Sequence, residues 1–150
     1  MDAMIYSPED LLVMFRTVWA EARGEGREGA LAVACVIRNR ATRAGYAHEL
    51  LGKEGALVRV CEAKWQFSCW NDGDPNKPKM LALQPEDAPD LFDLCQDVLD
   101  GAVHVDPTKG ADLYYAPQGM PNGEPPYWAA TVKQVAVIGH QIFFDGRMKS

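Results

Sequence analysis

The sequence has no excess of positive charge and no long apolar run. Its 15 lysines and arginines stand against 21 acidic residues, which gives a formal net charge of −6 at pH 7. Nucleic-acid-binding proteins carry a basic stripe and membrane-surface proteins a polybasic segment, so both classes are excluded. The longest apolar stretches, such as residues 31–37, are far too short to cross a bilayer. We therefore expect no nucleic-acid partner and no stable membrane association.

The N-terminus also lacks the features of a secretory signal, which are a basic region, a long apolar segment and a small-residue cleavage site. Close CxxC spacing is missing among the four cysteines, which favours free thiols made in a reducing compartment. We therefore expect synthesis in the cytoplasm, and neither a metal nor another cofactor. A zinc site built from these cysteines with His48, His104 and His140 is the alternative.

The pattern along the chain predicts a single domain over residues 1–150 of the α+β class. An apolar fraction of 47% is ordinary for a globular protein. Helices are expected at 8–24, at 27–40 with apolar residues nearly all round, more weakly at 56–63, and from Pro85 to 101. The proline-containing stretch 71–85 reads as a loop. Strand-like segments at 113–115, 132–138 and 141–144 predict a small C-terminal antiparallel sheet or hairpin around Gly139 and His140.

One acidic residue stands out in the first expected helix. Leu11, Phe15 and Val18 recur at helical spacing and define a core-facing stripe, and Glu21 lies on the shoulder of this stripe. Gly24 and Gly26 follow it and allow the chain to turn. Apolar surroundings raise the pKa of a carboxyl group, which lets it donate a proton at neutral pH. By periodicity alone, an acid in this position is more often an ordinary residue on the flank of a helix.

Several sequence blocks match a known family in order. They are WAEARGE at 19–25, EG at 28–29, VACVIRNR at 33–40, QFS at 66–68, DG at 72–73, LYYAP at 113–117 and IGHQIF at 138–143. Together they resemble the cell wall hydrolases of the SleB/CwlJ type, which degrade spore cortex. No single short block is specific, but the ordered set spans most of the chain.

This resemblance implies a mainly helical, lysozyme-like or lytic-transglycosylase-like domain. Such a domain would act on peptidoglycan glycan strands, at the bond between N-acetylmuramic acid and N-acetylglucosamine. The glutamate of the first block is the family's catalytic acid, so the resemblance assigns that role to Glu21. An acidic chain gains no long-range attraction to an anionic wall, so its affinity must come from short-range contacts.

Other residues of these blocks, and one aromatic residue outside them, are candidates for binding sugar. Six are expected to contact substrate: Glu25, Glu28, Gln66, Ser68, Tyr115 and Trp128. Glu25 and Glu28 could equally charge or cap the start of the second helix, and Trp128 could be a core residue. One of the adjacent tyrosines should pack in the core and the other line the site; analogy favours Tyr115 for substrate. His140 is interpreted as structural.

The reaction itself has two versions. A lytic transglycosylase needs one carboxyl group, whereas a hydrolytic muramidase usually needs a second. No obvious partner stands out among Asp72, Asp74 and Asp112, which favours a transglycosylase. We also expect a monomer that acts on the cell wall, released either as a phage endolysin through a holin or as a bacterial remodelling enzyme.

Two further function classes remain open. One is a noncatalytic wall-binding module, which would have no need of a desolvated Glu21. The other is a cysteine peptidase or amidase that uses Cys61 or Cys69 with His104, for which no nucleophile motif is recognisable.

Overall fold

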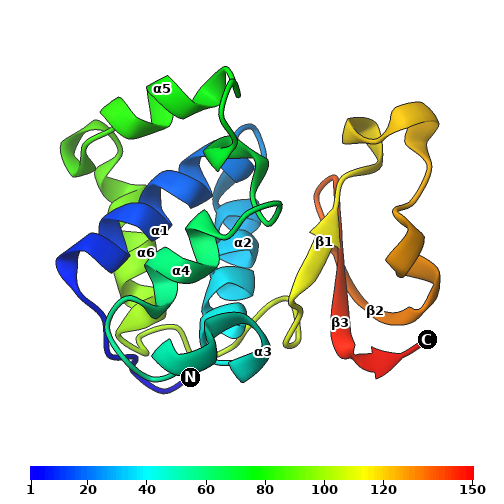
Figure 1. Cartoon of the computed structure of the whole chain (residues 1–150), viewed down its shortest axis with the longest axis horizontal. Helices are drawn as coiled ribbons and strands as arrows, with labels where there is room; N and C mark the ends of the chain where they lie inside the picture. The colour runs from blue at the N-terminus through cyan, green and yellow to red at the C-terminus, as the bar shows by residue number, and fades with distance from the viewer.

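Helices come first and strands last in the computed structural model, which describes residues 1–150 (Figure 1). The α-helices are α1 (Pro8–Glu21), α2 (Gly26–Ala41), α3 (Ala44–Ala47), α4 (Ala56–Glu62), α5 (Asn76–Ala82) and α6 (Pro89–Leu99). The strands are β1 (Leu113–Tyr115), β2 (Val132–Ile138) and β3 (Gln141–Lys149). The predicted α+β class is confirmed. No helix is both long enough and apolar enough to span a membrane.

A buried carboxylate fixes the start of α1. Ser7 caps the helix: its Oγ accepts a hydrogen bond from the Asp10 backbone N–H at 3.1 Å, and Asp10 Oδ2 accepts one from the Ser7 N–H at 2.9 Å. The same Asp10 carboxylate accepts hydrogen bonds from the N–H groups of Gly55 at 2.8 Å and Val58 at 3.1 Å. It therefore satisfies orphan donors at the start of α4 as well, and ties the two helices together.

Helix α2 is buried on two sides, as its nearly all-apolar sequence predicts. On one side, Val33 and Ile37 join the large helical core, which also contains Phe15 of α1. On the other, Ala32 and Val36 form a smaller core with residues that include Phe143 of β3. Helix α2 is thus the element on which the sheet packs.

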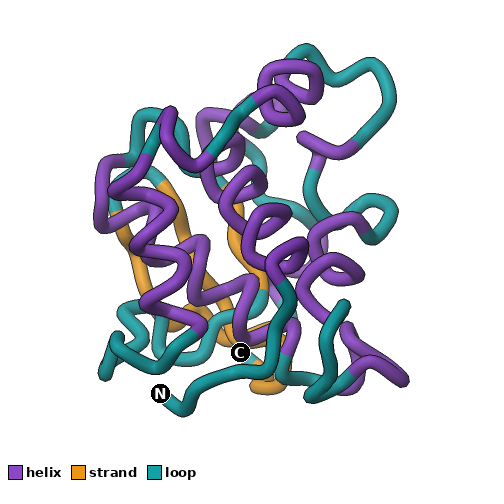
Figure 2. Tube along the Cα trace, turned by 90° about the vertical axis from the view of Figure 1, so that its left-hand side faces the viewer, coloured by secondary structure: helices purple, strands orange, loops and turns teal.

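The sheet is antiparallel with strand order β1-β3-β2. Strands β2 and β3 form the predicted hairpin around Gly139 and His140, and β3 continues to Lys149, beyond the predicted end. β1 pairs with β3 so that Tyr114 lies opposite Phe143. Viewed from the helical side, the strands lie behind the helices (Figure 2).

The structure corrects three expected boundaries. Residues 71–85 are not a continuous loop, because α5 forms within them. The last helix begins at Pro89 rather than Pro85, and a separate 3₁₀ turn occupies Pro85–Asp87. Proline disfavours helical backbone in the residue before it; accordingly Ala88 has φ −149° and ψ 67°, which separates the two segments. Helix α1 ends at Glu21, before the two glycines at which an end was expected.

Candidate active site

Glu21 is the last residue of α1, and its carboxyl group is mostly shielded from water. This burial is the largest influence on its pKa, which rises from an ordinary 4.5 to about 7. The nearby negative charge of Asp74 raises it further, whereas the Tyr114 hydrogen bond and the Arg40 charge lower it. At neutral pH, Glu21 can therefore hold a proton. The desolvated carboxyl group required of a general acid is present.

Tyr114 is the side chain that hydrogen-bonds Glu21. Its hydroxyl donates to Glu21 Oε1 at 3.5 Å, across 93 residues of sequence. The tyrosine ring stacks on Phe143, with centroids 5.5 Å apart, so the small core between α2 and the sheet holds it in place. Burial raises the pKa of Tyr114 well above its ordinary value, so the hydroxyl keeps its proton and remains a donor.

Arg40 supplies the positive charge near Glu21. Its Nε donates to the carbonyl oxygen of Asp112 at 2.7 Å, and its Nη1 donates to Gln66 Oε1 at 3.2 Å. The guanidinium also lies over the Phe67 ring, 4.8 Å from the centroid. Arg40 is itself only 4% exposed. It joins the end of α2 to the QFS block and to β1, and it opposes the effect of burial on the Glu21 pKa.

The three candidate second carboxylates have different surroundings. Asp72 is exposed and pairs with Lys77 at 2.9 Å. Asp112 is buried and fully engaged, because its carboxylate meets Arg43 at 3.1 Å, the Tyr46 hydroxyl at 3.0 Å and the Gly146 N–H at 2.6 Å. Only Asp74 is among the groups that shift the Glu21 pKa. If a second acid takes part, Asp74 is the one placed for it.

The other predicted substrate residues lie in different places. Gln66 and Ser68 are exposed, and Gln66 is bound to Arg40. Tyr115 points away from Tyr114. The centroid of its ring lies 6.1 Å from that of Trp128 and 5.9 Å from that of Phe144. The structure thus brings Tyr114 to Glu21, whereas analogy favoured Tyr115 for substrate. Substrate contact by Tyr115 and Trp128 stays a prediction.

Glu25 connects the helices to the hairpin. Its Oε2 lies 3.0 Å from His140 Nδ1, and its Oε1 accepts a hydrogen bond from the His140 N–H at 3.3 Å. Gly29 makes room for it, because a Cβ on Gly29 would lie 2.3 Å from Glu25 Cβ, whereas a Cβ on Gly139 would only be in ordinary contact with Glu25 Oε2, at 3.5 Å. Glu28 is exposed in the first turn of α2, where an acid complements the helix dipole. Sugar contact by either glutamate stays a prediction.

The cysteines and histidines do not form a joint site. All four cysteines are free and buried, and burial raises the pKa of each thiol, to about 12 for Cys35 and Cys61. His104, the suggested base for a cysteine nucleophile, is exposed. No group of three or more His, Cys, Asp or Glu side chains is arranged to hold a metal ion.

Comparison with known proteins places the sequence in a family. The model of the family described as Cell Wall Hydrolase matches residues 24–144, a range that begins just after Glu21. The chain belongs to the cell wall hydrolase family. This confirms the resemblance to cell wall hydrolases that the sequence blocks indicate.

Named relatives match nearly the whole chain. The spore cortex-lytic enzyme of Oceanobacillus iheyensis is 32% identical over 138 residues, which is 92% of this chain and 42% of that protein. The enzyme of the same name from Bacillus cereus is 30% identical over 138 residues, 92% of this chain and 45% of its own length. The chain thus spans less than half of the length of these curated relatives.

Solved structures agree in fold. The catalytic domain of the Bacillus cereus SleB protein superposes with a TM-score of 0.69 at 27% identity, covering 93% of this chain and 92% of that one. The catalytic domain of the germination-specific lytic transglycosylase SleB from Bacillus anthracis gives 0.68 at 27% identity, with 93% and 97% covered. The predicted mainly helical domain with a small C-terminal sheet is confirmed.

Sequence reasoning identified Glu21 but missed its neighbours. Arg40 lies in one of the matching sequence blocks, but the sequence does not show that its charge acts on the Glu21 pKa. Tyr114 was one of two adjacent tyrosines that the alternation of a strand could not tell apart. Asp74 was one of three candidates. No local signal in the sequence separates these residues, because their proximity to Glu21 depends on tertiary packing.

Proposed function

We propose that this chain cleaves peptidoglycan glycan strands between N-acetylmuramic acid and N-acetylglucosamine, with Glu21 as the catalytic acid. The single observation that carries the proposal is the partly buried Glu21 carboxyl group with a pKa of about 7. Glycosidic bonds break through an oxocarbenium-like transition state, and the departing oxygen needs a proton as it leaves. Membership of the cell wall hydrolase family and the names of its relatives support peptidoglycan as the substrate.

The proposed reaction is a lytic transglycosylation that uses one carboxyl group twice. Protonated Glu21 gives its proton to the glycosidic oxygen as the bond to the anomeric carbon breaks. The resulting carboxylate then takes the proton of the muramic acid 6-hydroxyl, whose oxygen bonds to the same anomeric carbon. The products are a 1,6-anhydro end and a free 4-hydroxyl; no water is consumed, and Glu21 is again protonated.

Tyr114 suits this double role. Its hydroxyl donates to Glu21 Oε1, so it stabilises the carboxylate that forms halfway through the reaction. At 3.5 Å this hydrogen bond is long, so the carboxyl group can still be protonated near neutral pH. We therefore assign Tyr114 as a positioning residue for Glu21.

A hydrolytic muramidase is the second candidate, and Asp74 is the observation that favours it. Its charge acts on Glu21, and it could serve as the base that activates water. One Asp74 carboxylate oxygen already accepts a hydrogen bond from the Asn76 N–H at 2.8 Å, at the start of α5. This hydrogen bond gives Asp74 a structural role that does not require it to be a catalytic base. We therefore favour the reaction that uses Glu21 alone.

The test is digestion of purified peptidoglycan by the wild type, Glu21→Gln and Asp74→Asn, with the soluble products identified by mass. Exposed Glu54, changed to Gln, is the matched control for loss of one carboxylate. We expect anhydro ends from the wild type, Asp74→Asn and Glu54→Gln, and almost no product from a folded Glu21→Gln. Reducing ends, heavier by one water, that disappear in Asp74→Asn would identify hydrolysis instead. Binding to sacculi without any released fragment would support the noncatalytic wall-binding module.

Release by a phage holin and a monomeric state stay predictions. Co-expression with a holin should lyse cells that expression of the chain alone leaves intact, and sedimentation would give the oligomeric state.

A further inference from the structure

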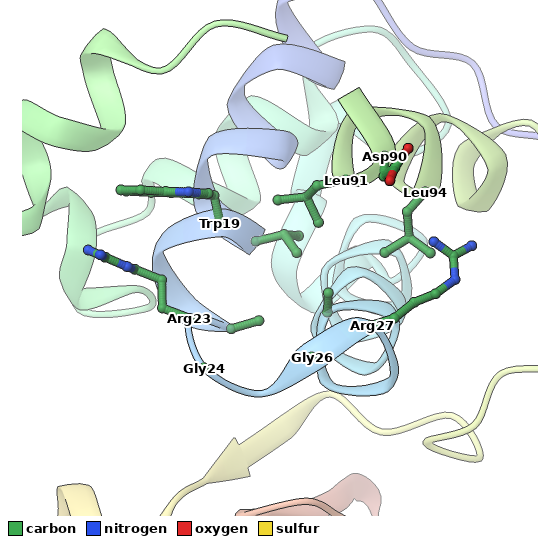
Figure 3. A pocket seen from close by; sticks show the side chains of 11 residues that line it. Trp19, Arg23, Gly24, Gly26, Arg27, Asp90, Leu91 and Leu94 are labelled. Atoms are coloured by element: carbon green, nitrogen blue, oxygen red, sulfur yellow. The ribbon is translucent and has the colours of Figure 1, made fainter. Parts of the chain in front are cut away.

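A pocket of about 390 Å³ lies at the end of α1, next to the residues that follow Glu21, and Glu21 itself does not line it. It forms between the end of α1, the turn into α2 and the first part of α6 (Figure 3). Its apolar lining includes Val18, Ala30 and Leu94. Ala22 and Arg23, the two residues after Glu21, are also part of the lining. The wall of the pocket therefore starts at the residue that follows Glu21 in the chain.

Two arginines flank this pocket without a carboxylate partner. Arg23 stands with Trp19 on one side and Arg27 on the other (Figure 3). Arg23 lies over the Trp19 ring, 4.6 Å from its centroid, and donates to Asn76 Oδ1 at 3.3 Å. Arg27 is exposed and makes no hydrogen bond or ion pair within the chain. In a protein with 21 acidic residues and 15 basic ones, two guanidinium groups that form no ion pair at one pocket favour an anionic ligand.

A third charged residue at the pocket limits which kind of anion could bind there. Asp90, from the first turn of α6, lies on the Arg27 side (Figure 3). Two arginines against one aspartate leave the lining with a single net positive charge. A highly charged anion such as a polyphosphate would meet the Asp90 carboxylate, whereas a carboxylate on an aliphatic residue would meet arginine and apolar side chains. An amino group on the same ligand could face Asp90.

We propose that this pocket binds the peptide stem of peptidoglycan by a free carboxylate, with Arg27 as the main contact and Arg23 as the second. The inference rests on the proposed function, because that function places a muramic acid at Glu21. The stem is the branch that muramic acid carries, and it combines short aliphatic residues with free carboxylates. A cavity of about 390 Å³ falls in the range of small-ligand pockets and suits a few such residues.

The first test compares two forms of the same substrate. One is peptidoglycan with intact stems; the other is the same glycan strands after an amidase has removed the stems. We expect Arg27→Gln to raise KM on the stem-bearing form by roughly 10- to 100-fold, the worth of a charge-assisted hydrogen bond, with kcat little changed. On stripped strands, Arg27→Gln should match the wild type. The control is Arg59→Gln, which removes an arginine of α4 that pairs with Glu49. It should leave KM unchanged on both substrate forms.

The outcomes separate this inference from the proposed function. A wild type that cleaves neither substrate would refute the proposed function, whereas an Arg27→Gln variant with equal KM on both forms would refute only the stem pocket. If the wild type cleaves only stem-bearing strands, a binding experiment tests the pocket instead. An isolated stem tetrapeptide is titrated into the isotope-labelled protein, and the amide signals are followed by NMR. Shifts of the Gly24, Gly26 and Arg27 amides in the wild type that are lost in Arg27→Gln support the pocket, and their absence in the wild type overturns it.

Discussion

Glu21 should make the folded protein less stable as the pH rises, and replacing it by glutamine should remove this effect. The folded-state pKa of about 7 exceeds the ordinary 4.5, so the folded protein holds a proton that the unfolded chain releases between these values. Stability then falls as the pH rises through that window and levels off above it. The amide side chain introduced by Glu21→Gln cannot ionise, so the variant should keep its stability across the same window.

The magnitude follows from the pKa. Each tenfold change in proton affinity corresponds to about 1.4 kcal/mol, so a rise from 4.5 to about 7 sets a ceiling of about 3 kcal/mol. Glu21 keeps some contact with water, which screens its charge and brings the expected gain of Glu21→Gln to about 2 kcal/mol at pH 8. For a chain of this size that corresponds to a rise in Tm of roughly 4–8 °C. Below about pH 4.5 the two proteins should melt together.

The assay is thermal unfolding of the wild type and Glu21→Gln by circular dichroism from pH 4 to pH 9. Glu54→Gln is the control, since Glu54 is exposed and should show no such pH-dependent gain. A Tm difference that stays constant with pH, or a Glu21→Gln variant that is less stable at pH 8, would refute the desolvation of Glu21. The same variant should be inactive, so stability and activity would change in opposite directions at one side chain.

Three other predictions concern the surroundings of Glu21 and the core. Tyr114→Phe removes a hydrogen bond that lowers the Glu21 pKa, so the alkaline limb of the kcat/KM profile should move up by about one pH unit at most; a downward move would contradict this assignment. Asp10→Asn should cost about 2–4 kcal/mol in urea denaturation, because one carboxylate serves the starts of α1 and α4. The matched control Asp87→Asn, at an exposed turn, should cost far less. Iodoacetamide should leave the native activity intact, since burial raises the pKa of all four thiols. Inactivation would instead support the hypothesis of a cysteine nucleophile.

Most helices and strands could be predicted because each depends on the spacing of apolar residues within its own segment. The apolar run in α2 gave a helix buried on two sides, and the alternation around Gly139 gave the hairpin. Helix α5 was missed because prolines at 75 and 78 suggested a loop. In the structure Pro75 is the N-cap residue and Pro78 lies in the first turn, where a backbone N–H has no helical partner to lose.

The candidate site was less accessible to sequence reasoning. Motif resemblance identified Glu21, but its pKa also depends on Asp74, Arg40 and Tyr114, which arrive from three different segments. Strand alternation showed that Tyr114 and Tyr115 face opposite ways, yet only the packing of Phe143 against α2 decides which of them faces Glu21. Arg23 lies in the first sequence block and Arg27 in none, and the sequence does not show that both line one pocket without a carboxylate partner.

The strand order of the sheet determines when, during synthesis, the candidate site can first be completed. Tyr114 is carried by β1, and β1 pairs only with β3, which follows β2 in the chain. During synthesis, the helices and even β2 can leave the ribosome while β1 still has no strand to join. Glu21 therefore receives its tyrosine only after β3 has been made. The candidate site around Glu21 is therefore incomplete while only the helical part of the chain has emerged.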